Sequence, residues 1–301
     1  MTIRVLICDE IAEEGIRLLD QKGFAVTKAW DLPKSDLAMI IGDFDALIVR
    51  SATKVTADLL AHAKKLKVIG RAGEGLDNID LKKAAELGID VVNTPHVGAN
   101  SVAELTMGHL LALARGIVEG TLSLREGKWI KNDLMGVEIN GKTLGIVGCG
   151  SIGKTVERLA LAMGMKVVGV DMCVYGRFVT LEEMLPQADF ITIHVPLTPH
   201  TRHMISTKEF EIMKDGVMIV DCSRGGVVDQ EALYEALVSG KVEAAALDVF
   251  EEEPPKNSKL LRLKNVHATP HIGAQTVEAQ LKSSVLVAER VIAVLEKSIT
   301  S

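Results

Sequence analysis

Three segments in the second half of the sequence each place a charged side chain just after an apolar, strand-like run. These side chains belong to Arg224, Glu253 and His271. Oxidation of a hydroxyl group to a ketone requires a base for the O–H proton, and histidine suits that task near neutral pH. A carboxylate orients an imidazole and favours its protonated form, and the planar guanidinium of arginine binds a substrate carboxylate. Together these residue types indicate a site that oxidises a small hydroxy acid.

Each of the three residues also has a plain structural interpretation. An arginine beside two glycines fits a tight turn, and a histidine after proline fits an exposed loop. Glu253 ends an acidic run that fits a solvent-exposed surface. The carboxyl ends of parallel strands meet at one edge of a doubly wound sheet, where ligands bind. Because all three residues follow strand-like runs, the catalytic interpretation is favoured when they are taken together.

A glycine-rich loop precedes these segments and predicts a dinucleotide site. Gly148, Gly150 and Gly153 form a GxGxxG pattern between a strand-like run and a helical one. The three glycines permit a tight turn, close approach of a pyrophosphate, and close packing of the helix on the strand. Asp171 ends the next strand-like run, 23 residues after Gly148. A carboxylate there binds ribose hydroxyls and repels a 2′-phosphate, so we expect NAD rather than NADP.

The elements that position these residues alternate between short β-branched runs and amphipathic segments, which predicts an α/β fold with parallel sheets. A long helical stretch over residues 100–125 separates two such series, and another helical stretch covers 274–296. Two doubly wound, Rossmann-like units are therefore expected. The predicted strands are 3–8, 24–27, 46–49, 67–69, 90–92, 143–147, 166–170, 190–194, 217–220, 244–249 and 266–269.

Composition limits the function classes. The 301 residues are 48% hydrophobic and 25% charged, which is typical of a globular chain, and the net charge of -6 argues against a general nucleic-acid binder. The first apolar run is too short for a signal peptide or a membrane span, so we expect a cytoplasmic protein without a membrane partner. The four cysteines have no CxxC spacing, and no metal site is predicted.

The sequence resembles the D-isomer-specific 2-hydroxyacid dehydrogenases over essentially its whole length. The motifs that carry the resemblance are RSATKVTAD at 50–58, GRAG and GLDN within 70–78, NSVAE at 100–104, the glycine loop, CSRGG at 222–226, LDVF at 247–250 and PHIGA at 270–274. The resemblance implies a substrate domain made of residues 1–95 and 275–301, with the NAD domain, 96–274, inserted between them. It also implies a homodimer.

The resemblance assigns roles to particular residues. Arg224 would hold the substrate, His271 would donate or accept the proton, and Glu253 would pair with His271. Further residues would fall at cofactor positions, and Val195 stands where the family often has threonine. The cofactor positions are Gly148, Gly150, Ser151, Ile152, Gly153, Asp171, Val195, Cys222, Ser223, Arg224, Asp248, His271, Gly273 and Ala274.

The substrate positions come from the branch of the family that the sequence most resembles, which acts on D-3-phosphoglycerate. Arg50 and Arg71 match residues that bind the substrate phosphate, although surface ion pairs are the plain alternative. Gly73 and Glu74 lie in the same segment, and Glu74 replaces a threonine or small apolar residue. A carboxylate there either raises the cost of binding an anionic substrate or points outward.

The resemblance thus implies NAD-dependent oxidation of D-3-phosphoglycerate to 3-phosphohydroxypyruvate, in serine synthesis. One alternative is a dehydrogenase for glyoxylate, hydroxypyruvate or another D-2-hydroxy acid. A remote alternative is an NAD-sensing binding protein without enzyme activity, because a fold does not determine function. The resemblance ends near Ser301, so we expect no C-terminal regulatory module.

Overall fold

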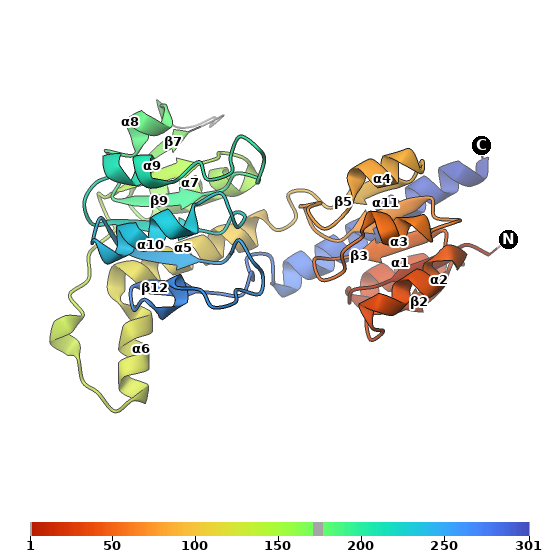
Figure 1. Ribbon diagram of the computed structural model, residues 1–301, viewed down its shortest axis with the longest axis horizontal. Coiled ribbons are helices and arrows are strands. Elements are labelled where there is room, and N and C mark those ends of the chain that lie inside the picture. The colour runs from red at the N-terminus through yellow and green to blue at the C-terminus, as the bar shows by residue number, and fades with distance from the viewer. Residues whose placement is uncertain (1, 171–176, 301) are drawn as a thin grey trace. The chain divides into compact units, whose positions relative to one another are not determined.

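The β-branched runs form parallel strands, and the amphipathic segments form helices that cover the sheets, in the computed structural model (Figure 1). The structure describes residues 2–170 and 177–300. The chain divides into two units: the first comprises Met1–Gly98 and Ala274–Ser301, and the second comprises Ala99–Gly273. Each unit has a parallel sheet, so the predicted pair of doubly wound sheets is confirmed.

The first unit has the strand order β2-β1-β3-β4-β5, in which the chain reverses direction across the sheet between β1 and β3. Successive residues of β1 point to opposite faces, and both faces are buried. The strands are β1 (Arg4–Ile7), β2 (Ala25–Lys28), β3 (Ala46–Val49), β4 (Val68–Arg71) and β5 (Asp90–Asn93). The helices before the second unit are α1 (Glu13–Gln21), α2 (Leu37–Ile40), α3 (Ala57–Ala61) and α4 (Leu81–Glu86).

The last helix, α11 (Val277–Thr300), completes the core of the first unit. It packs beside α1 on one face of the sheet and contacts β4. A Cβ atom on Gly70 of β4 would lie 2.6 Å from Val291 and 2.8 Å from Val287, so only glycine admits the helix this closely. A Cβ on Gly98 would lie 3.0 Å from that of Ala274, so the chain leaves the first unit and returns to it at adjacent points.

The second unit has the strand order β12-β11-β10-β9-β6-β7-β8, and the reversal lies between β6 and β9. This is the order of the dinucleotide-binding fold. The strands are β6 (Thr143–Val147), β7 (Lys166–Val170), β8 (Arg177–Phe178), β9 (Phe190–Ile193), β10 (Val217–Asp221), β11 (Val242–Leu247) and β12 (Val266–Ala268). The helices are α5 (Ala99–Arg115), α6 (Ile117–Arg125), α7 (Ser151–Ala162), α8 (Leu181–Met184), α9 (Thr207–Ile212) and α10 (Gln230–Val238).

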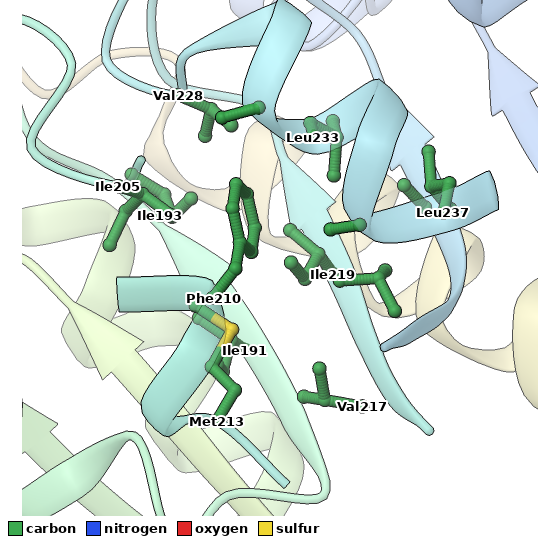
Figure 2. Packing of buried hydrophobic residues seen from close by; sticks show 14 of the residues in the cluster. Ile191, Ile193, Ile205, Phe210, Met213, Val217, Ile219, Val228, Leu233 and Leu237 are labelled. Atoms are coloured by element: carbon green, nitrogen blue, oxygen red, sulfur yellow. The ribbon is translucent and has the colours of Figure 1, made fainter. Parts of the chain in front are cut away.

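One core of the second unit lies between its sheet and helices α9 and α10 (Figure 2). Ile191 and Ile219 project from the central strands, and Phe210 and Leu233 project toward them from the two helices. All four are at most 3% exposed. This packing makes the strands a rigid platform whose carboxyl ends carry the loops described below.

The single helix predicted over 100–125 is wrong, because it breaks into α5 and α6 at Gly116. Gly116 takes a left-handed conformation with φ of 59°, which costs glycine little and ends a helix. The axes bend by 67° there. Within the described residues, no single helix has the length and apolarity to cross a membrane, although α5 and α6 together meet both criteria across their bend.

The predicted strands agree closely with the observed ones. One short strand, β8, was not predicted. Two short helices, α2 and α4, were not predicted either. The sequence Thr180-Leu-Glu-Glu183 fits a capping box, and the structure confirms it. The Thr180 side chain accepts the N–H of Glu183, and the Glu183 carboxylate accepts the N–H of Thr180.

Candidate active site

The glycine loop after β6 has the geometry that a dinucleotide requires. Gly148 has φ of 91°, and a Cβ atom there would lie 2.7 Å from the carbonyl oxygen of His194. Gly153 lies in the first turn of α7, where a Cβ would collide with the carbonyl oxygen of Gly148. The first and third glycines therefore let α7 begin directly against the end of β6.

The space beside this loop suits a pyrophosphate. Gly150 is the N-cap of α7 and brings no side chain to the first turn. Apart from its two chain neighbours and the backbone of its own helix, no described atom lies within 4 Å of a Cβ atom placed on Gly150, so open space adjoins the helix N-terminus there. Ser151 and Ile152 supply the first backbone N–H groups of that helix, where anions bind favourably. These residues fit a dinucleotide; Asp171 lies outside the described residues.

The carboxyl ends of β9, β10, β11 and β12 meet at one edge because these neighbouring strands are parallel. The structure brings most of the predicted cofactor and catalytic residues of the second unit to this edge. They are Val195 after β9; Cys222, Ser223 and Arg224 after β10; Asp248 and Glu253 after β11; and His271 and Gly273 after β12. Ala274 lies in the first unit.

Glu253 and His271 form a direct pair. His271 Nδ1 lies 2.7 Å from Glu253 Oε2, and Glu253 Oε1 accepts the backbone N–H of Phe250 at 3.1 Å. Burial disfavours the charged Glu253 carboxylate, but His271, the Phe250 N–H and the charge of Arg224 outweigh it, so the pKa of Glu253 is below its ordinary value. An ionised carboxylate accepts hydrogen bonds only, so Nδ1 of His271 carries a proton and Nε2 faces away from the pair.

Arg224 is half-buried beside this pair. Its Nη1 donates to the carbonyl oxygen of Ser223 at 2.8 Å, and its charge contributes to the lowered pKa of Glu253. A cation, a carboxylate and an imidazole thus lie close together at the edge of the sheet.

Asp248 holds the loop that carries His271. Its side chain is 1% exposed, and its Oδ1 accepts the N–H of Ile272 at 2.8 Å. Its Oδ2 accepts the N–H of Gly273, also at 2.8 Å. His271 has φ of 53°, an uncommon conformation for a residue with a side chain. The contacts of Asp248 are those of a residue that holds backbone in place, a role that the sequence did not indicate.

Asp221, at the end of β10, is also buried. Its Oδ1 accepts the N–H and the hydroxyl of Ser223 at 2.9 and 2.6 Å. Burial raises the pKa of Asp221 from 3.8 to about 6, with a further rise from Asp248, although Ser223 and Arg224 oppose the change. The carboxylate shapes the turn before Arg224 at a cost in free energy.

In the first unit, Arg50 follows β3 and is tied to its surroundings at both ends. Its backbone N–H donates to Asp9 Oδ2 at 2.7 Å, and its Nη2 donates to Gln275 Oε1 at 2.9 Å. Burial lowers the pKa of Arg50, which Asp9 and Glu10 oppose. Asn78 donates to the carbonyl oxygen of Arg50 at 2.7 Å. The loop that presents the guanidinium is therefore well supported.

Arg71 lies at the same end of the neighbouring strand, since it pairs in register with Val49. Gly73 has φ of 147°, and a Cβ atom there would overlap the Arg71 guanidinium, so Gly73 makes room for that side chain. Glu74 Oε2 accepts the backbone N–H of His96 at 3.3 Å, and its Oε1 lies 3.8 Å from His96 Nδ1. The Glu74 carboxylate is thus held toward the end of β5.

Several supporting residues were not found from the sequence. Asp9 had a weak signal, because it ends the first apolar run at the carboxyl end of β1. Gln275 and His109 had none, because each lies in a helical pattern or beside one, and its partner is distant in sequence. Residues that position a site through other residues carry no spacing pattern of their own.

Several known proteins, and one protein-family model, are similar to this chain over much of its length. Residues 107–273 match the model of the D-isomer specific 2-hydroxyacid dehydrogenase, NAD binding domain. A D-3-phosphoglycerate dehydrogenase of Methanocaldococcus jannaschii is 49% identical over 302 residues, covering 97% of this chain and 57% of that protein. A hydroxypyruvate reductase of Thermotoga maritima is 51% identical over 296 residues, covering 96% of this chain and 97% of that protein.

A crystal structure of the TT0316 protein from Thermus thermophilus has a TM-score of 0.91 and 36% identity, covering 98% of this chain and 97% of that one. The chain spans little more than half the length of the phosphoglycerate dehydrogenase that it matches and nearly all of the reductase. The family model covers most of the second unit, which therefore contains an NAD-binding domain. This chain belongs to the D-isomer specific 2-hydroxyacid dehydrogenase family.

Proposed function

We propose that this chain is an NAD-dependent D-2-hydroxyacid dehydrogenase that oxidises D-3-phosphoglycerate to 3-phosphohydroxypyruvate. The observation that carries the enzymatic part is the hydrogen bond of 2.7 Å between His271 and Glu253 beside Arg224. An NAD-sensing protein would need the glycine loop but not this pair. In the proposal, the second unit binds NAD and the first unit binds the phosphate of the substrate.

The residues of the second unit would bind and orient the substrate and transfer its hydroxyl proton. Bound NAD supplies the acceptor for a hydride from C2 of the hydroxy acid. His271 takes the hydroxyl proton at Nε2, because Nδ1 already donates to Glu253. Glu253 stabilises the imidazolium that results, and Arg224 binds the substrate carboxylate and polarises the forming carbonyl. In reduction, the same proton returns from His271 to the carbonyl oxygen.

The choice of a phosphorylated substrate depends on Arg50 and Arg71. Both side chains leave the carboxyl ends of adjacent strands, and glycine at position 73 makes room for the second. Two guanidinium groups so placed suit a phosphate, which accepts charge-assisted hydrogen bonds from several directions. The 49% identity to a protein named D-3-phosphoglycerate dehydrogenase supports the same substrate.

A second candidate is reduction of hydroxypyruvate or glyoxylate. It is favoured by the 51% identity to a hydroxypyruvate reductase that the chain matches over 97% of its length. Glu74 favours it too, since a carboxylate three residues after Arg71 raises the cost of binding a dianion nearby. The two candidates share the catalytic trio and differ in the residues of the first unit.

One assay separates these candidates. Initial rates are measured with NADH and with NADPH on 3-phosphohydroxypyruvate, hydroxypyruvate and glyoxylate, for the wild type and for Arg50→Ala. We expect the substitution to lower kcat/KM about 10- to 100-fold for the phosphorylated substrate and less than threefold for the others, given about 1.5–3 kcal/mol for a charged hydrogen bond. Arg17→Ala is the control, because Arg17 is 64% exposed and pairs with Glu14. Equal losses on all three substrates would remove the phosphate assignment, and no turnover of any would favour a sensor.

We further propose a homodimer formed through the segment from α6 to residue 137. This segment carries strongly exposed apolar side chains, including Leu124 at 60%, Trp129 at 80% and Met135 at 91% exposed. In Figure 1, α6 extends away from the sheet of its unit. Apolar side chains so exposed favour burial against another chain. Light scattering at several concentrations tests the dimer.

A further inference from the structure

A series of buried polar groups, connected by hydrogen bonds, supports the loop that carries His271. Asp248 lies at its centre, with Oδ1 accepting the Thr269 hydroxyl at 2.6 Å as well as the N–H of Ile272. On the far side of Thr269, the Nε2 atom of His109 lies 3.1 Å from the same hydroxyl oxygen. His109 comes from the middle of α5 and is 7% exposed.

The directions of the two hydrogen bonds at the Thr269 hydroxyl follow from its single proton. The Thr269 hydroxyl has one proton, and that proton goes to Asp248. The Thr269 oxygen must therefore accept from His109, which requires a proton on Nε2 of His109. Burial lowers the pKa of His109, more than the charge of Asp248 raises it, and nearby His267 lowers it further. His109 is thus a neutral donor with its proton on Nε2.

This series of polar groups ends at the backbone that positions His271. The N–H of His271 donates to the carbonyl oxygen of Thr269 at 3.0 Å, and the next two N–H groups donate to Asp248. A residue with φ of 53° keeps that conformation only where its surroundings hold it firmly. Without a donor from α5, the Thr269 hydroxyl could rotate away from Asp248, and the carboxylate would lose one of the groups that orient it.

We propose that His109 is a positioning residue for His271, and that it acts through Thr269 and Asp248. This inference rests on the proposed function, in which His271 transfers the substrate proton. His109 would then contribute more to the rate of proton transfer than to cofactor or substrate affinity. A displacement of about 1 Å at a catalytic group can lower a rate by a factor of about 100.

Two pairs of similarly shaped substitutions test the donor. His109→Gln keeps an N–H near the position of Nε2, whereas His109→Met has similar length and no donor. Thr269→Ser keeps the hydroxyl, and Thr269→Val removes it. We expect kcat for keto-acid reduction to fall about tenfold in His109→Met and in Thr269→Val, and less than threefold in His109→Gln and Thr269→Ser. The KM for the keto acid and the Kd for NADH should change by a smaller factor than kcat in His109→Met and in Thr269→Val, and less than twofold in the other two variants.

A double variant identifies the route. If His109 acts through Thr269, His109→Met combined with Thr269→Val should lose no more activity than Thr269→Val alone. Losses that multiply to about 100-fold, or equal losses in His109→Met and His109→Gln, would overturn the proposal. Thermal unfolding of each variant shows whether it folds. If His109→Met does not fold, the comparison of Thr269→Val with Thr269→Ser still tests the proposal.

A readout independent of turnover separates this inference from the proposed function. Hydrogen–deuterium exchange of a peptide spanning residues 269–273 should quicken in His109→Met and Thr269→Val and stay unchanged in His109→Gln and Thr269→Ser. Unchanged exchange in all four overturns the inference even if His271→Ala abolishes turnover. Wild-type turnover in His271→Ala removes the proposed role of His271, whatever the exchange shows.

Discussion

Replacing Glu253 with glutamine would remove one charge from the proposed catalytic pair and nearly keep its shape. The single amide oxygen can accept the Nδ1–H of His271 and so keep the imidazole oriented, but the amide NH2 group then faces the N–H of Phe250, which loses its acceptor. What is lost is the attraction between a carboxylate and the imidazolium that forms when His271 takes the substrate proton. Glu253→Gln therefore tests chiefly the contribution of charge, together with the loss of the hydrogen bond from Phe250.

The magnitude follows from the geometry of the pair. A hydrogen bond to a charged group contributes about 1.5–3 kcal/mol, and one between neutral groups about 0.5–1.5 kcal/mol. The two side chains are 42% and 38% exposed, so water screens their attraction. Subtracting the lower ends and the upper ends of these ranges gives about 1–1.5 kcal/mol, and because of the screening we expect no larger difference. Since about 1.36 kcal/mol is a tenfold change in rate, kcat should fall about 5- to 15-fold.

The assay is NADH formation under saturating D-3-phosphoglycerate and NAD. Glu252→Gln is the matched control, because Glu252 is 61% exposed and pairs with Lys256 at 3.3 Å; its kcat should equal that of the wild type. Glu253→Ala, which removes orientation as well, should lose more than Glu253→Gln. A loss below twofold in Glu253→Gln would refute the role of charge, and equal losses in the Gln and Ala variants would refute the separation of charge from orientation.

Two further predictions concern stability and cofactor binding. The raised pKa of Asp221 means that the unfolded chain releases this proton near pH 3.8 and the folded chain near pH 6. Stability therefore falls as pH rises through this window, by about 3 kcal/mol for a change of two pH units. Asp221→Asn should be more stable than the wild type by about 1–3 kcal/mol at pH 8 and nearly equal to it at pH 4 in urea unfolding; a difference independent of pH would contradict the assignment. Gly150→Ala should unfold at the wild-type temperature, because the added Cβ collides with no protein atom. It should bind NADH at least tenfold more weakly, because the Cβ would occupy space that the pyrophosphate needs. Gly153→Ala should lose both stability and binding, because its Cβ meets the Gly148 carbonyl. NADH fluorescence titration and thermal unfolding check the pair, and wild-type affinity in Gly150→Ala would place the pyrophosphate elsewhere.

The fold could be predicted because its signals are local. A run such as Ala46–Val49, apolar at every position, is typical of a strand buried on both faces of a parallel sheet, and the amphipathic segments between such runs supply the covering helices. The break at Gly116 could not be predicted in this way. A glycine within an apolar, helix-periodic stretch is compatible with both a continuous helix and a left-handed stop, and only packing of the flanking segments decides between them.

The site was predictable where strand ends carry its residues. Arg224, Glu253 and His271 follow consecutive strands of one parallel sheet, so they had to meet at one edge once that sheet existed. The contact between His109 and Thr269 joins residues 160 positions apart, one from a helix and one from a loop. No rule of sheet geometry brings a helix side chain to that loop, and both residues are ordinary in their local patterns.

The position of α11 in the first unit has a consequence for synthesis of the chain. Residues 4–98 contribute every strand of that unit, but Val287, Val291 and Leu295 of α11 form one wall of its core. On a ribosome, the nascent first segment emerges with one sheet face covered by α1 but not by α11, and 178 residues separate Gly98 from the start of α11. At about 5–20 residues per second, this delay lasts roughly 10–40 s. The inserted unit is therefore the first that can fold to completion, and chaperone demand should concentrate on the apolar face that α11 covers last.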